Sequence, residues 1–213
     1  VGEAKWSDAD ETSFSKLGDR YLQMAPRGPY AVDVRFKRAF IAYEKEKFDI
    51  AATGFKQLGW SKEAFDHPKS AKAQDLYLDI LNIRKDYRRL KEASQQLLVL
   101  AESLASSGGK ALDKTRQDQL AKIRREAWFA EVGEVEHKAS NKEEHRKAVE
   151  MYRAFAMDNK GSELAPKAWW NASQILFRSG DVSEAAGMCA QMPKSFPGAP
   201  NIKECLQQAA QTY

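Results

Sequence analysis

The sequence predicts an all-α protein made of antiparallel helical hairpins, about four of them, with further helices at both ends. The first observation is composition, because Ala, Leu, Lys, Glu, Gln and Arg dominate and these residues favour helices. The second is that β-branched residues are sparse and never alternate with polar ones over the length of a strand. With 43% hydrophobic and 30% charged residues, the chain has the apolar content of an ordered protein. The third observation is a helical pattern that repeats.

The repeated pattern is centred on one small or apolar residue, the anchor, which has neighbours on the same face of a helix. Ala185 is the clearest anchor, with Val182 before it and Cys189 and Met192 after it at helical spacing. Four other anchors have neighbours at the same helical spacing, and they are Leu17, Ala51, Leu90 and Ala148. The intervals between anchors vary from 34 to 58 residues, which is typical of a repeated helical hairpin with insertions.

A first helix is expected before each of the last four anchors. These helices are Ala31–Glu44, Ser70–Arg84, Ala111–Ala139 and Leu164–Arg178. The breaks between the two helices of each pair are expected near Glu46, at Lys85-Asp86, at Ser140-Asn141 and at Ser179-Gly180-Asp181. Proline lacks an N–H and restricts φ, so it ends one hairpin and starts the next. The prolines between hairpins are Pro29, Pro68, Pro166 and Pro197.

The expected organisation is a single domain over residues 1–213. It consists of a half repeat at 8–26, repeats at 31–60, 69–106 and 163–195, a repeat with a long first helix at 110–158, and a cap or further repeat at 199–213. The first anchor lacks a preceding helix, and the last segment can begin another hairpin. We therefore expect both ends to be cut from a longer array.

The segment around Ala185 resembles the tetratricopeptide repeat (TPR), whose pattern is W-x2-L-G-x2-Y, then A-x3-F, then P. Every offset is kept without a gap, although several identities differ. The matching residues are Trp169, Ala172, Ser173, Leu176, Gly180, Ala185, Cys189 and Pro197. The resemblance covers nearly the whole chain and implies a right-handed solenoid. The segments 67–77 and 161–186 are also similar to the bacterial envelope branch of the family, the YbgF-like and YfiO-like proteins.

The resemblance implies a concave surface lined by the first helices, on which a partner peptide or helix binds. The groove positions carried over from the family are Phe36, Phe40, Tyr43, Asp75, Asp79, Asn82, Trp170, Gln174, Phe177 and Arg178. Aromatic side chains beside polar ones suit a protein partner. The alternative, that several of them pack against a neighbouring helix or an insertion, stays open.

Cys189 and Cys205 are the only cysteines, and they are expected on one seam between two antiparallel helices. A disulfide between them would indicate an oxidising compartment, which together with the resemblance favours the periplasm. Two buried free thiols are the alternative, and they would favour the cytoplasm.

Other classes of site are not indicated by the sequence. The basic cluster at Arg84, Lys85, Arg88, Arg89 and Lys91 is interrupted by acidic residues, so it is interpreted as a solvated helix face rather than a nucleic-acid site. The spacing of His137 and His145 does not fit a helical zinc site. No phosphate-binding loop or nucleophile elbow is found, and no apolar run is long enough to span a membrane.

The expected function is therefore a scaffold without catalytic residues, metal or cofactor that binds a protein or peptide partner in a bacterial envelope assembly or motility complex. Two alternatives stay open, a cytoplasmic TPR adaptor and a recruiting or regulatory domain of a larger enzyme. Neither the partner nor the oligomeric state follows from the sequence.

Overall fold

The computed structural model describes residues 7–211, and within that range the chain forms ten α-helices and no strand. The chain divides into two compact units, Val1–Ala121 and Lys122–Tyr213. The all-α class predicted from composition and periodicity is confirmed. Residues 212 and 213 of the expected terminal cap lie outside the described range.

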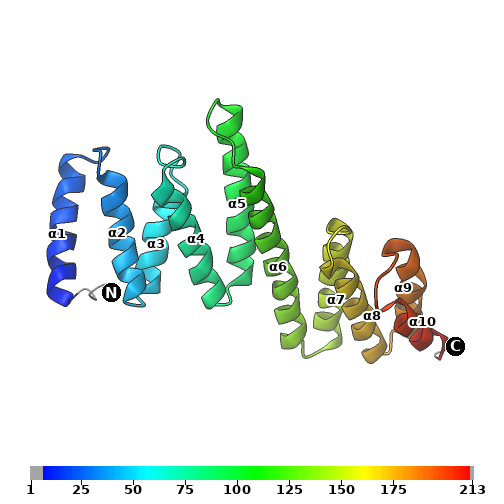
Figure 1. Ribbon diagram of the computed structural model, residues 1–213. Coiled ribbons are helices and arrows are strands. Elements are labelled where there is room, and N and C mark those ends of the chain that lie inside the picture. Colours follow the sequence, from blue (N-terminus) through cyan, green and yellow to red (C-terminus); the bar gives the residue numbers. More distant parts are fainter. Residues whose placement is uncertain (1–6, 212–213) are drawn as a thin grey trace, which may run out of the picture. The chain divides into compact units, whose positions relative to one another are not determined.

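Unit 1 contains five complete helices and the beginning of a sixth. They are α1 (Asp8–Met24), α2 (Ala31–Glu44), α3 (Phe48–Gly59), α4 (Pro68–Ile83), α5 (Tyr87–Ser106) and the start of α6 (Lys114–Lys138). Consecutive helices from α1 to α5 pack against each other and run in alternating directions (Figure 1). Helix α2 also contacts α4. First helices of neighbouring hairpins therefore lie side by side.

Unit 2 contains the end of α6 and four further helices. They are α7 (Lys142–Asp158), α8 (Leu164–Arg178), α9 (Val182–Ser195) and α10 (Ile202–Ala210). The core of unit 2 is built around Trp169, whose indole N–H donates to the carbonyl of Met188 at 2.9 Å. Aromatic contacts fix α6 to α7, because Trp128 and Phe129 lie edge-on to Phe155 with ring centroids 5.3 and 5.5 Å apart.

Three hairpins close with the same turn. The residues with positive φ in these turns are Glu46 (57°), Lys85 (55°) and Gly180 (79°). In each turn the next residue's N–H donates back to a carbonyl in the last turn of the helix at 2.8 to 2.9 Å, which is the Schellman arrangement. The three donor and acceptor pairs are Lys47 with Ala42, Asp86 with Leu81, and Asp181 with Leu176.

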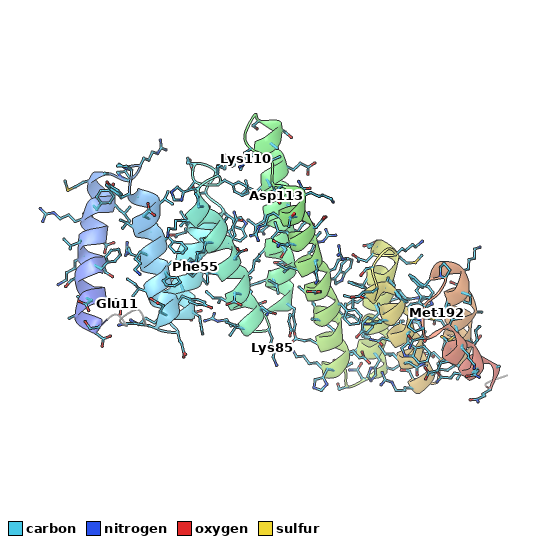
Figure 2. All side chains as sticks on the ribbon, in the orientation of Figure 1. Glu11, Phe55, Lys85, Lys110, Asp113 and Met192 are labelled. Atoms are coloured by element: carbon cyan, nitrogen blue, oxygen red, sulfur yellow. A yellow bond between two sulfur atoms is a disulfide. The ribbon has the colours of Figure 1, made fainter. Side chains whose placement is uncertain are left out.

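The repeated turn aligns the three hairpins independently of the residue types in them. Ala51, Leu90 and Ala185 follow it at one common spacing, and all three are buried. These are anchors predicted from the sequence, and Ala148 is buried as well. Figure 2 shows Lys85 at the turn between α4 and α5 and Phe55 among the packed helices of unit 1. The breaks expected near Glu46, at Lys85 and at Gly180 are confirmed.

The prediction that Leu17 is the packing anchor of the first helix is wrong, because this residue is 69% exposed. The neighbouring Gly18 is the buried small residue of α1, and a Cβ there would lie 3.1 Å from Val34 Cγ1 on α2. The apolar pattern of α1 led to the error, since Leu17 and Met24 form an exposed stripe. Close approach of two helices selects the smallest residue, and at this position that residue is glycine.

Candidate partner-binding surface

Three aromatic side chains on α2 form a continuous stack along one face of the helix. Phe36, Phe40 and Tyr43 follow each other at helical spacing, with centroid distances of 5.8 and 6.4 Å and nearly parallel rings. Phe36 is buried, whereas Phe40 and Tyr43 are partly exposed. Phe55 of α3 lies beneath the stack and contacts both Phe36 and Tyr43. The stack is thus a core cluster that continues to the surface.

Helix α4 extends this surface with charged residues at both ends. The Nζ of Lys69 lies 4.9 Å from the centre of the Phe36 ring, and the Nζ of Lys72 lies 5.6 Å from that of Phe40. At the other end the Tyr43 hydroxyl donates to Asp79 Oδ2 at 2.7 Å. This bond, with burial as the smaller cause, raises the pKa of Tyr43. We call this surface the α2/α4 face, formed by Phe36, Phe40, Tyr43, Lys69, Lys72 and Asp79.

Two further predicted groove residues on α4 lie next to this face. Asp75 is exposed and pairs with Arg116 at the start of α6, with 2.6 Å between Oδ1 and Nη1. Arg116 also donates to the buried Gln74, whose own amide N–H₂ donates to the carbonyl of Gly59 at 2.9 Å. Asn82 is exposed near the C-terminal end of α4. All six predicted groove residues of unit 1 therefore lie on α2 and α4, which contact each other.

The four predicted groove residues of unit 2 lie on α8, and two of them bond to neighbouring helices. Gln174 donates to Gln208 of α10 at 2.7 Å, and Arg178 donates to Glu136 of α6 at 2.7 Å. Trp170 and Phe177 are partly buried and pack against the core of unit 2. The alternative that these positions pack against neighbouring helices therefore applies on α8, whereas partner binding there stays a prediction.

A hollow of about 770 Å³ lies beside Arg178, between the ends of α6 and α8 and the start of α7. Its wall includes Glu136, whose carboxylate accepts from both Arg178 and the hydroxyl of Tyr152. The Nδ1 atom of His145 is buried in this wall and has no hydrogen-bond partner among residues 7–211. Two cations in its lining are paired, Lys142 with Asp181 and Arg178 with Glu136.

A disulfide joins Cys189 of α9 to Cys205 of α10, with 5.1 Å between the two Cα atoms. Both residues are buried in the core of unit 2, and Ser173 Oγ of α8 lies 3.7 Å from the sulfur of Cys205. The seam expected between two antiparallel helices is thus where the sulfurs meet. Among the described residues, no cluster of three or more His, Cys, Asp or Glu could hold a metal ion.

Sequence reasoning missed Lys69, Lys72 and Arg116. The two lysines were identifiable, because residues 69, 72, 75 and 79 recur at intervals of three and four and so share a face of α4. No comparable signal marks Arg116, which reaches Asp75 across a long sequence separation. Its position depends on how α6 packs in unit 1.

No protein-family model matches the chain, and no curated protein matches it. Between residues 7 and 211, no helix combines the length and apolar character that a membrane span requires.

Proposed function

We propose that this chain is a TPR-like scaffold without catalytic activity, which binds a segment of a partner protein on the α2/α4 face. The observation that carries the proposal is the aromatic stack, which continues from the buried Phe36 to the partly exposed Phe40 and Tyr43. Aromatic side chains that are anchored in a core and open to solvent bind protein partners at a low cost in side-chain entropy.

The repeated hairpin turn supports the TPR-like assignment. Measured from the residue of positive φ, the predicted groove positions fall in matching sets: Phe36, Asp75 and Trp170; Phe40, Asp79 and Gln174; Tyr43, Asn82 and Phe177. Each set therefore occupies one position in three hairpins. A repeat that keeps its packing residues while varying its surface residues is suited to recognition.

The disulfide supports an oxidising location, and we place the scaffold in the bacterial periplasm, within an envelope assembly or motility complex. Buried disulfides persist in such compartments and are rare in the cytosol. The similarity of segments 67–77 and 161–186 to envelope TPR proteins agrees with this location. A cytoplasmic adaptor would be expected to keep Cys189 and Cys205 as thiols.

Site-specific photo-crosslinking in the native host tests the proposed function. A benzoylphenylalanine replaces Phe40 on the α2/α4 face or, as the control, Ile50 on α3, which is 63% exposed. We expect a protein adduct from position 40 that position 50 does not give, and helical circular dichroism should be unchanged in both. The same adducts from both positions, or none from position 40, would contradict a binding role for this face.

A further inference from the structure

The charges of the α2/α4 face indicate the chemistry of the partner. The Nζ of Lys69 lies 4.9 Å from the Phe36 ring centre, and the Nζ of Lys72 lies 5.9 Å from the same centre. Lys72 and Lys37 also lie over Phe40, at 5.6 and 5.5 Å. Three ammonium groups therefore converge on two adjacent rings.

Lys69 and Lys72 have no carboxylate within ion-pair distance in residues 7–211, whereas Asp75, the next charged residue on the same face of α4, is paired with Arg116. Their contacts with the rings are cation–π interactions, which are weak at exposed sites. Like charges held this close repel each other, and a carboxylate placed between them would remove that repulsion. The ammonium groups of Lys69 and Lys72 are therefore available to pair with an anionic group of a partner.

The acidic residues of α4 indicate which class of anionic partner fits this face. Asp79 and Asp75 lie further along the same helix, and Asp79 is exposed next to the partly exposed Tyr43. A nucleic-acid backbone or a lipid surface presents negative charge continuously and would meet these carboxylates. A protein segment can instead present one or two acidic side chains beside an apolar one, which matches two lysines next to Phe40.

Building on the function proposed above, we propose that the α2/α4 face binds an acidic protein segment. In this segment Asp or Glu side chains pair with Lys69 and Lys72, and a neighbouring apolar side chain packs on Phe40 and Tyr43. The ion pairs are exposed, so they give selectivity for charge while the aromatic contact gives most of the affinity.

Selection from a random peptide library displayed on phage tests this inference. The protein is used as wild type, as Lys69→Glu/Lys72→Glu, as Phe40→Ala, and as the matched control Lys16→Glu/Lys110→Glu. The control makes the same charge change at two exposed lysines outside the face. Circular dichroism verifies that each variant is folded, and fluorescence anisotropy then measures the affinity of synthetic copies of the selected peptides.

We expect the wild type and the control to enrich peptides with Asp or Glu beside an apolar residue. Lys69→Glu/Lys72→Glu should bind these peptides about tenfold more weakly, since each exposed ion pair contributes less than about 1 kcal/mol, and should itself enrich basic peptides. Phe40→Ala should lose them almost completely. Binding of the wild type should also weaken as salt is raised.

Three results would overturn the inference, and the first of them separates it from the proposed function. If the selected peptides need Phe40 but show no charge preference, the inference of an acidic partner is wrong, whereas the proposal that this face binds a protein segment stands. If no Phe40-dependent peptide is selected, both are wrong. Binding of polyuridylate or of phosphatidylglycerol vesicles that Lys69→Glu/Lys72→Glu abolishes, with no acidic peptide selected, would likewise replace the protein partner by a polyanion.

Discussion

At the scale of single residues, the hairpin turns contain two side chains in a conformation that glycine adopts more easily. Glu46 and Lys85 have φ of 57° and 55°, whereas the equivalent residue of the last hairpin is Gly180. A residue with a Cβ is strained in this left-handed region by about 1 kcal/mol or more. The turn is nevertheless formed in all three hairpins, so helix packing on both sides imposes it.

Lys85→Gly should therefore stabilise unit 1. The gain from relieved strain exceeds the extra entropy of glycine in the unfolded chain, and we expect a net increase of about 0.5 to 1 kcal/mol in the free energy of unfolding. Urea denaturation of the variant and the wild type measures it. Gly180→Ala is the matched reverse change and should destabilise by a similar amount. A lower urea midpoint for Lys85→Gly would show that Lys85 is not strained.

A second residue-scale prediction concerns the buried Tyr152, which is 2% exposed. Burial raises its pKa to about 12, and the hydrogen bond from its hydroxyl to the Glu136 carboxylate adds to the rise. In the unfolded chain the phenol has its ordinary pKa of 10.0. Because the unfolded state releases this proton first, the stabilising contribution is complete below pH 10 and is lost as the pH rises from 10 to about 12.

Tyr152→Phe isolates this contribution from the other tyrosines. The free energy of unfolding of the wild type should fall more steeply between pH 10 and 12 than that of the variant, and the difference between them should shrink across this range. Urea titrations at several pH values measure both. Parallel pH profiles would mean that Tyr152 is not kept neutral by the fold.

At the scale of helices, the sequence pattern predicted the helix bounds where these depend on residues within the helix and its turns. The expected first helices 31–44 and 164–178 agree with the bounds of α2 and α8, since apolar periodicity marks both helices and the turns at Glu46 and Gly180 end them. Pro166, which is expected between hairpins, instead lies in the first turn of α8, where a proline is tolerated. The expected helix 111–139 begins three residues early, because residues up to 113 form a loop and Asp113 accepts a hydrogen bond from the N–H of Arg116. Figure 2 shows Lys110 and Asp113 in this connection.

The candidate site was only partly predictable for the same reason. Phe40 and Tyr43 follow from the repeat register, which local spacing sets. The bond between Tyr43 and Asp79 and the pair between Asp75 and Arg116 join different helices, and they depend on the packing of α2, α4 and α6. Sequence periodicity identifies the face of a helix but not the residue that it meets on another helix.

At the scale of the whole molecule, the proposed binding face and the disulfide belong to different compact units. The disulfide spans 16 residues and fixes α10, a helix of nine residues. A helix of that length is unstable without tertiary contacts. Cross-linking a loop of this size contributes about 3 kcal/mol, mainly by restricting the unfolded chain.

Reduction should therefore loosen unit 2 and leave the α2/α4 face unchanged. Hydrogen exchange followed by mass spectrometry, with and without dithiothreitol, should show faster exchange in α10 and α9 and no change in α2 and α4. The variant Cys189→Ala/Cys205→Ala, without reductant, controls for effects of dithiothreitol itself. Affinity for peptides selected through Phe40 should be the same in both states. Loss of that affinity with unchanged exchange in α2 and α4 would mean that the partner also contacts unit 2, where Trp170 and Gln174 occupy the positions equivalent to Phe36 and Phe40.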